Sequence, residues 1–364
     1  MNRIAYSKHG ARLGAGLLTL MFALLFAGPA AAKETIKVGE VVAWPSYSMM
    51  QLAVEQNLVP SKYDVQVQVL QDPLTAYGLL ASGKLDVLGG TADYVSVAVA
   101  KGLPIVGVSM NDLSYGTDQV VAAPGVRGAP DVKGQKIAAP QAYIGELLMG
   151  LWLDKIGVKP AEVDWVDINA PNAVGPMLSG KLAAAYMYNP WIDKVLKNMD
   201  GAHVVATSHQ PYYLKTGILG DTIYMNKDFV KNHRQAAKDM IKARFDGLQY
   251  WHEHTNQANE QIAQFLQWPK KDVEAVVGTN GKYRDGGLYL FDFDQAAKYC
   301  GVKNGELPLG LKNGQWKEAA TKTNQWWIKL GLLEHMHEVS SGIDCSLVQE
   351  LVDSGYHQSM SARQ

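Results

Sequence analysis

The feature that most constrains the fold is a repeated alternation of short apolar strands with helices along most of the chain. Residues 63–70 (YDVQVQVL) alternate polar and apolar side chains, which is typical of a strand with one buried face. The segment 74–82 follows Asp72 and Pro73, an N-cap residue and a first-turn proline that together signal a helix start. This alternation predicts parallel sheets with helices on both faces. In this series we expect strands at 35–42, 63–70, 85–88 and 104–109, and helices at 48–56, 74–82 and 93–100.

A second series of the same kind begins near residue 135. The segment 80–86 (LASGKLD) is echoed at 177–183 (MLSGKLA), and in both places a helix is expected to end at Ser-Gly before a strand. Gly83 and Gly180 should therefore take the left-handed conformation that commonly closes a helix. Two matched series predict two related lobes. The second series has expected strands at 136–139, 163–168 and 183–188, and expected helices at 144–155, 172–179 and from 190 to 197.

Two segments, 117–123 and 218–225, have the character of crossings between the lobes. They place the first lobe at residues 33–125 plus 221–364 and the second lobe at residues 126–220. A lobe that is entered and left by two strands can close over a ligand by a hinge motion. The chain after residue 226 becomes mainly helical, which predicts a helical C-terminal extension on the first lobe. Its expected helices cover 233–254, 257–266 and 313–329.

The first 32 residues have the order of a cleavable secretory signal. Arg3, Lys8 and Arg12 form a basic start, residues 15–27 are almost wholly apolar, and small residues end the segment at Ala32. We expect cleavage after Ala32, so that the mature chain starts at Lys33. The alternative is a retained N-terminal anchor, although the apolar run is shorter than the roughly 18 residues of a membrane-spanning helix.

Charge and cysteine content narrow the class of protein. The formal net charge is −1, which gives no indication of a nucleic acid or an acidic membrane surface as partner. Cys300 and Cys345 are the only cysteines, and they could form one disulfide or remain separate buried thiols. Their spacing does not form a zinc pattern, so we expect no metal site.

Motifs of common enzymes are missing from the sequence. His252 and His254 are two residues apart, so on a helix they point to different faces, and the same objection applies to His335 and His337. No phosphate-loop pattern, no Gly-x-Gly-x-x-Gly after a strand and no Gly-x-Ser-x-Gly elbow is found. We therefore expect a binding protein without catalytic residues and without a cofactor.

Several ordered motifs carry a family resemblance. They are Val38-Gly39-Glu40, the segment 52–58 (LAVEQNL), the segment 81–87 (ASGKLDV), the segment 132–138 (VKGQKIA) and Tyr188-Asn189-Pro190-Trp191. In their order and spacing the chain resembles the periplasmic binding proteins of nitrate, sulfonate and taurine importers, a family that includes binders of pyrimidine vitamin precursors. Asn57 stands where the family has glycine, and Tyr188 stands where it has tryptophan.

The resemblance implies a two-lobed α/β fold of the periplasmic-binding-protein kind, type II-like, with a mostly parallel sheet in each lobe. It also implies a monomer in the periplasm that delivers a small molecule to the permease and ATPase of an ABC importer. Fungal pyrimidine-precursor synthases share this fold, but they carry a cysteine-rich motif that is missing here. A sensor that presents its ligand to a membrane receptor is the other alternative.

Candidate ligand contacts come from the loops at the carboxyl ends of the strands, where ligands of open parallel sheets bind. Asp93 could instead cap its helix, and Asp118 could brace the hinge. Aromatic and acidic side chains dominate these loops, and lysine and arginine are missing from them. The candidates are Trp44, Tyr47, Thr91, Asp93, Asp112, Tyr115, Asp118, Tyr143, Glu146, Asn172, Tyr188, Asn189 and Trp191.

This composition predicts the charge of the ligand. Aromatic faces attract organic cations, and carboxylates form charge-assisted hydrogen bonds with amidinium, guanidinium or ring N–H groups. An anion would favour basic side chains or helix N-termini without nearby carboxylates. We therefore expect a small organic nitrogen compound, cationic or a nitrogen-rich heterocycle, with a sulfonate or nitrate as the alternative ligand.

Overall fold

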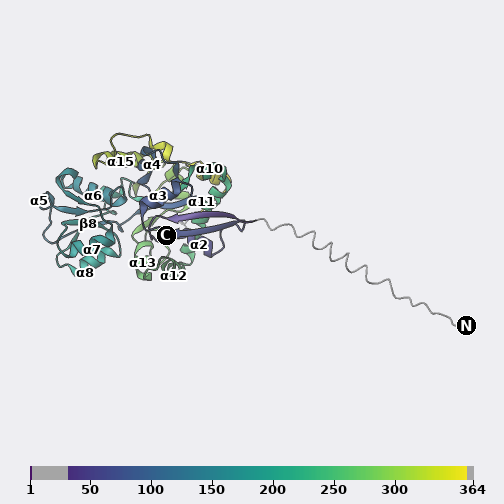
Figure 1. The fold of residues 1–364 in the computed structure, drawn as a ribbon, viewed down its shortest axis with the longest axis horizontal. Helices are drawn as coiled ribbons and strands as arrows, with labels where there is room; N and C mark the ends of the chain where they lie inside the picture. Colours follow the sequence, from purple (N-terminus) through teal and green to yellow (C-terminus); the bar gives the residue numbers. More distant parts are fainter. Residues whose placement is uncertain (2–31, 359–364) are drawn as a thin grey trace.

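The computed structural model describes residue 1 and residues 32–358, and the expected signal sequence falls on residues 2–31, outside this range. Two sheets lie side by side, each with helices against its faces (Figure 1). No helix among the described residues is long and apolar enough to cross a membrane.

The first sheet contains β1 (Glu34–Glu40), β2 (Tyr63–Val69), β3 (Val87–Thr91), β4 (Ile105–Ser114), β10 (Gly220–Asn226) and β11 (Leu288–Leu290). The second sheet contains β5 (Gln119–Ala122), β6 (Lys136–Ala138), β7 (Asp164–Val166), β8 (Ala184–Met187) and β9 (His203–Thr207).

The two sheets share the same topology except for β11, which adds an antiparallel edge strand to the first. The first has the order β11-β4-β10-β3-β1-β2 and the second has the order β7-β6-β8-β5-β9. In each sheet one antiparallel strand lies between parallel ones: β10 pairs with β3 and β4, and β5 pairs with β8 and β9. These two strands are the ones that the chain enters directly after crossing from the other sheet. The expected fold, two lobes with mostly parallel sheets, is confirmed.

The strand β5 shows where the first crossing lies. Its residues 119–122 pair within the second sheet, whereas the sequence-based boundary at residue 125 assigned them to the first lobe. The chain therefore leaves the first sheet at the end of β4 and crosses within residues 115–118. It returns between the end of β9 at Thr207 and the start of β10 at Gly220.

Local signals in the sequence explain several helix ends. Asp72 is the N-cap of α3 (Pro73–Ala81), and its carboxylate accepts a 2.8 Å hydrogen bond from the Thr75 amide. Gly83 and Gly180, the glycines that follow α3 and α7 (Ala170–Leu178), have φ values of +70° and +69°, as expected for residues that close helices. These turns lead directly into β3 and β8.

Helices cover the two sheets differently. In the first lobe α2 (Met49–Glu55) packs on the long helix α11 (Arg234–Glu253), and α4 (Tyr94–Ala100) packs on β4. In the second lobe α6 (Ile144–Lys155) and α7 lie on opposite sides of β8, with α8 (Trp191–Asn198) beside α7 (Figure 1). A small separate core forms where Val121, Met177 and Met187 meet under α7 and α8.

The sequence did not reveal every element. The short strand β9 and the short helix α9 (Pro211–Leu214) are not among the elements expected from the sequence. The helices α12 (Thr255–Leu266) and α15 (Gln315–Lys329) agree with the expected ones. Four elements of the C-terminal extension were not expected: β11, α13 (Lys270–Val277), α14 (Phe293–Cys300) and α16 (Ser346–Asp353). Two further short helices are α5 (Ala129–Val132) and α10 (Lys227–Asn232).

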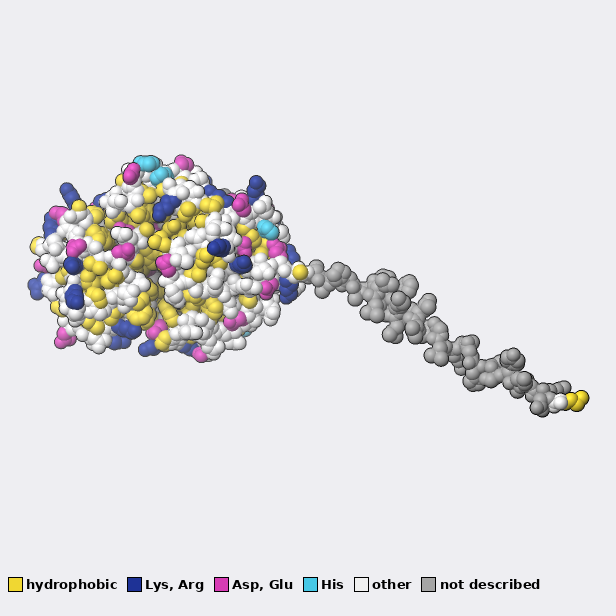
Figure 2. Space-filling view, viewed as in Figure 1, with side chains coloured by type: hydrophobic (Ala, Val, Ile, Leu, Met, Phe, Trp, Pro, Cys, Tyr) yellow, Lys and Arg dark blue, Asp and Glu magenta, His cyan; other side chains and the backbone are white. Residues whose placement is uncertain are grey.

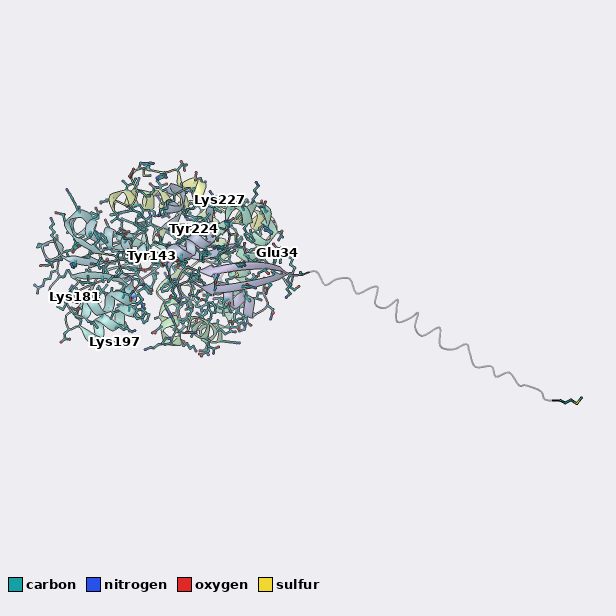
Figure 3. All side chains as sticks on the ribbon, in the orientation of Figure 1. Glu34, Tyr143, Lys181, Lys197, Tyr224 and Lys227 are labelled. Carbon is teal, nitrogen blue, oxygen red and sulfur yellow. A yellow bond between two sulfur atoms is a disulfide. The ribbon has the colours of Figure 1, made fainter. Side chains whose placement is uncertain are left out.

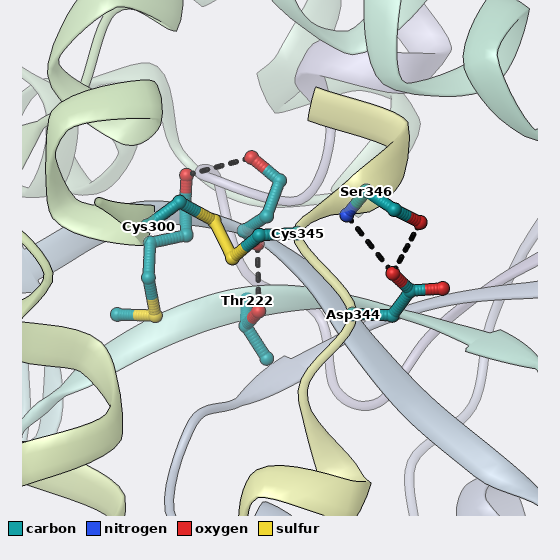
Figure 4. The surroundings of a disulfide bond; sticks show 7 residues. Thr222, Cys300, Asp344, Cys345 and Ser346 are labelled. Carbon is teal, nitrogen blue, oxygen red and sulfur yellow. Dashed lines mark hydrogen bonds between the residues drawn. A yellow bond between two sulfur atoms is a disulfide. The ribbon is translucent and has the colours of Figure 1, made fainter. Parts of the chain in front are cut away.

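A disulfide joins two parts of the C-terminal extension. Cys300, at the end of α14, is bonded to Cys345, directly before α16 (Figure 4). The pair lies beside β10, where the Thr222 hydroxyl donates a 2.6 Å hydrogen bond to the Ser109 carbonyl. Of the two possibilities left open by the sequence, the structure contains the disulfide.

Candidate ligand-binding site

A cavity of about 360 Å³ lies at the junction of the two sheets. Figure 2 shows this junction as a hollow flanked by hydrophobic side chains, and Figure 3 shows Tyr143 between the two halves. Both lobes and both crossings contribute to the wall. The lining residues are Val42, Trp44, Tyr47, Thr91, Asp112, Ser114, Asp118, Tyr143, Ile144, Tyr186, Tyr188, Gly220, Asp221 and Leu288.

Two carboxylates of the wall come from neighbouring strands. Asp112 on β4 and Asp221 on β10 are register partners in the antiparallel ladder, so their side chains stand next to each other on the same face. The Asp112 carboxylate accepts a hydrogen bond from the Ser46 hydroxyl through Oδ2, while its Oδ1 is buried without a partner. Asp221 accepts hydrogen bonds from the Tyr47 hydroxyl (2.8 Å) and the Trp44 indole N–H (3.0 Å).

A third carboxylate comes from the first crossing. Asp118 is buried and accepts a hydrogen bond from the hydroxyl of Tyr186, which lies on β8 of the second sheet. The same segment is joined to the returning chain, because the Ser114 hydroxyl donates to Ser208 Oγ at 2.6 Å and the Ser208 amide donates to the Asp118 carbonyl at 3.0 Å. The ligand cavity and the two crossings therefore share one hydrogen-bond network.

Aromatic rings from both lobes form most of the remaining wall. The Trp44 ring meets the Tyr188 ring edge to face with 5.5 Å between centroids, and Tyr188 meets Tyr186 at 6.1 Å. Tyr143, at the start of α6, completes this group. Trp44 and Tyr47 belong to the first lobe and the other three tyrosines to the second, so this aromatic wall is assembled across the junction.

The lining contains three aspartates, and none of the residues that line it is lysine or arginine. Arg244 of α11 interacts electrostatically with both Asp112 and Asp221, and its buried guanidinium donates hydrogen bonds to the carbonyls of Asn111 (3.2 Å) and Phe291 (3.3 Å). Burial lowers the pKa of Arg244 to about 10, so it stays charged at neutral pH. Its charge opposes that of the Asp112–Asp221 pair, and the ionisable acids of the lining stand beside neutral hydroxyl groups such as those of Tyr143 and Tyr188.

The pKa values show how costly these carboxylates are without a counter-ion. Burial raises the pKa of Asp112 to about 6, and it raises the pKa of Asp118 as well. Burial, followed by repulsion from Asp112, raises the pKa of Asp221 well above the ordinary range. Strongly perturbed carboxyl groups that converge on one cavity are typical of functional sites.

Seven of the residues expected from the sequence line the cavity: Trp44, Tyr47, Thr91, Asp112, Asp118, Tyr143 and Tyr188. Two more acidic candidates lie just behind the wall. Asp93 is fully buried at the start of α4, without a side-chain capping bond, and burial raises its pKa to about 7. Glu146 accepts a 2.7 Å hydrogen bond from the Ala142 amide, and burial raises its pKa to about 7.

The other candidates lie away from the lining. The Tyr115 ring packs near His209 and Tyr289, with centroids 6.2 and 6.4 Å apart. The Asn172 amide donates to Asn169, the N-cap of α7. Trp191 lies in a second groove, between α8 and the turn from α12 to α13, and Asn189 lines neither cavity.

The sequence-based selection missed Asp221 and Tyr186. Asp221 is the second residue of β10, which runs antiparallel to its neighbours, so the start of this strand lies at the edge where the parallel strands end. A rule based on the carboxyl ends of strands overlooks it. Tyr186 is inside β8, and its ring reaches the cavity because Gly145 of α6 leaves room for it: a Cβ at Gly145 would lie 2.3 Å from Tyr186 Cδ1. None of the described residues forms a cluster of three or more His, Cys, Asp or Glu suited to a metal ion.

Comparisons with known proteins agree with this architecture. Residues 62–258 match the family model described as NMT1/THI5 like. A protein of Brucella abortus (strain 2308) named as a binding protein is 25% identical over 272 residues, which cover 73% of this chain and 82% of the relative. The taurine-binding periplasmic protein of Escherichia coli (strain K12) is 23% identical over 232 residues, 62% of this chain and 69% of that one.

Solved structures show the same fold at lower identity. The alkanesulfonate-binding protein from Xanthomonas axonopodis pv. citri bound to MOPS superposes with a TM-score of 0.66 at 15% identity, covering 86% of this chain and 99% of that chain. The periplasmic nitrate-binding protein from Synechocystis PCC 6803 superposes with a TM-score of 0.65 at 16% identity, covering 88% and 89%. At this level of identity the comparison establishes the fold and leaves the ligand to the chemistry of the cavity.

Proposed function

The chain belongs to the NMT1/THI5-like family, as a solute-binding component of an ABC importer of the nitrate, sulfonate and taurine kind, and on this basis we propose that it captures a small organic nitrogen cation. The observation that carries the proposal is the set of three buried aspartates in a cavity whose lining residues include no basic side chain. A cation neutralises these carboxylates, whereas a sulfonate or nitrate would add negative charge beside them.

The aromatic wall supports the same ligand class. A cation over the face of a tryptophan or tyrosine gains roughly 2 kcal/mol when it is desolvated, and Trp44, Tyr143 and Tyr188 surround the cavity. The carboxylates supply the directional part of recognition through hydrogen bonds to ligand N–H groups. The first contribution favours any organic cation, and the second favours one rich in N–H donors.

Capture and release follow from the two-lobed architecture. We place one lobe at residues 33–118 plus 220–358 and the other at residues 119–219. The first boundary lies before β5 and not at the expected residue 125, because β5 pairs in the second sheet. The lobes close about the crossings joined by Ser114 and Ser208, and this brings Tyr186 and Tyr188 against Asp118 and Trp44. The ligand stabilises the closed form by the difference between its binding free energies for the closed and the open form.

The place of the protein in the cell follows from its family. We propose that it is exported by the N-terminal signal expected at residues 1–32, acts as a periplasmic monomer without catalytic activity, and delivers its ligand to an inner-membrane permease with its ATPase. A sensor role for a membrane receptor is the competing proposal. Deletion of the gene for this protein separates the two, because uptake of the ligand is lost if the protein serves an importer and continues if the protein only presents the ligand to a receptor.

The experiment that tests the ligand class is a thermal-shift screen of ligand-stripped protein against amines, amidines, guanidines, taurine, alkanesulfonates and nitrate. A ligand at a hundredfold excess over its Kd stabilises the folded state by about 2.7 kcal/mol, which is easily seen as a rise in Tm. We expect shifts with the cations only. A shift with the sulfonates or nitrate alone would retain the family and refute the cation proposal.

A further inference from the structure

The arrangement of acceptors in the cavity identifies the shape of the cation. The three carboxylates come from three different segments: Asp112 and Asp221 stand side by side on β4 and β10, and Asp118 comes from the first crossing. A carboxylate has about four lone-pair sites, so three carboxylates offer about twelve. The hydrogen bonds from Ser46, Tyr47, Trp44 and Tyr186 occupy four of them. A ligand that satisfies this buried site must therefore carry many N–H donors that point outward in several directions.

Aromatic rings line the cavity together with these acceptors. Trp44 and Tyr188 meet edge to face, and Tyr143 and Tyr186 complete the surface. The empty space between the lining atoms is about 360 Å³ and includes space open to solvent, so only a compact ligand fits. A planar cation places its π-face against such rings and its N–H edges toward the carboxylates at the same time.

From this juxtaposition we propose that the ligand is a planar guanidinium- or amidinium-type cation, with two carboxylates on one edge and Asp118 on another. Guanidinium has six N–H donors in one plane, whereas an alkylammonium has three donors clustered at one end and a strongly hydrated charge. The paired Asp112 and Asp221 match a bidentate edge, and the unpartnered Asp112 Oδ1 is one of the acceptors left for it. This inference rests on the proposed function and narrows it.

The test compares probes that differ in one property at a time. Guanidinium chloride is measured by calorimetry at low millimolar concentration against urea, which is planar but neutral, and against methylammonium chloride, which is charged but not planar. Acetamidinium serves as the second planar cation, and sodium chloride controls for ionic strength. We expect guanidinium and acetamidinium to bind at least tenfold more tightly than methylammonium and urea.

Variants locate the binding to the cavity. Asp112→Asn, Asp118→Asn and Asp221→Asn keep the size of each side chain and remove one charge, and each should lower guanidinium affinity at least tenfold. Asp193→Asn on the exposed face of α8 is the matched control and should leave affinity unchanged. Because the Asn side chains remove repulsion between buried carboxylates, the empty variants should melt no lower than the parent protein; a variant that does melt lower is replaced by Tyr188→Ala, which removes one ring of the wall.

The possible outcomes separate this inference from the proposed function. If methylammonium binds as tightly as guanidinium or more tightly, the planar ligand is refuted while cation capture stands. If urea binds as tightly as guanidinium, charge is not what the aspartates recognise, and both proposals fail. If none of these probes binds but taurine or nitrate does, both proposals fail and the anion alternative replaces them.

Discussion

The affinity for a cation should fall as the pH is lowered from 7 to 5. Burial raises the pKa of Asp112 to about 6 in the empty cavity, and a cation beside this carboxylate lowers that pKa on binding. Affinity is therefore complete above the pKa of the empty form and is lost as the pH falls through it. For Asp112 alone, the ionised fraction falls from about ten in eleven at pH 7 to about one in eleven at pH 5, so affinity falls about tenfold.

Protonation of the other carboxylates adds to this loss, so tenfold is a lower limit for the fall in affinity between pH 7 and pH 5. The pKa of Asp221 is raised further by burial and by repulsion from Asp112, and burial also raises the pKa of Asp118. Because Asp112 and Asp221 interact strongly, the titration belongs to the pair rather than to either residue. Arg244 interacts with this pair from α11 and opposes its protonation, whereas Glu146 and Asp93 do not line the cavity.

Calorimetry with guanidinium chloride at pH 5, 6 and 7 measures this effect directly. Titrations at one pH in buffers with different ionisation enthalpies count the protons released on binding, and we expect this number to grow from pH 7 to pH 5. In Asp112→Asn, the roughly tenfold fall in affinity between pH 7 and pH 5 that this carboxylate causes should disappear. Asp193→Asn should leave the slope as it is. An affinity that stays constant or rises toward pH 5 would refute the reasoning.

Further predictions concern stability and packing. The empty protein should melt at a higher temperature at pH 5 than at pH 7, because Asp112 has a raised pKa and the folded state therefore binds more protons than the unfolded state in this window; a lower Tm at pH 5 would contradict this. Replacing Cys300 and Cys345 together by serine opens a crosslink across 45 residues and should lower the free energy of unfolding by about 4 kcal/mol in urea titrations, without changing ligand affinity. Gly145→Val should lower cation affinity at least tenfold by displacing the Tyr186 ring, whereas Gly175→Ala on α7, where a Cβ meets nothing within 4 Å, should not; equal effects would show that the loss is not local to the cavity.

Most of the fold could be predicted because local signals agree with the global topology. The cap at Asp72 and the left-handed glycines Gly83 and Gly180 fix where helices end and strands begin. The alternation of strands and helices then determines the parallel part of each sheet. The missed elements, such as β9 and β11, are short strands of five and three residues, in which periodicity cannot be recognised.

The candidate site was predictable only where it follows the rule for parallel strands. Trp44, Asp112 and Tyr143 follow or end such strands, and the structure places them in the lining. Asp221 was missed because β10 runs in the opposite direction, and this direction depends on pairings between residues more than 100 positions apart. The position of Asp118 could be read from the sequence, but its contact with Tyr186 could not, since that contact exists only when the two sheets meet.

The charge of the closed cavity has a consequence for selectivity. Closure without a cation brings Asp112, Asp118 and Asp221 together inside an aromatic shell, with Arg244 as the only buried counter-charge beside the Asp112–Asp221 pair among the described residues. Burying ionised carboxylates without a counter-ion costs free energy, so the empty protein should either protonate them or keep its cleft open. A bound cation compensates their charge, so the cleft can close while they stay ionised. An anion would increase this cost, so under the proposed function the aspartates that bind a cation would also exclude sulfonates and nitrate. The electrostatics of closure would then supply the selectivity against the ligands named for its relatives.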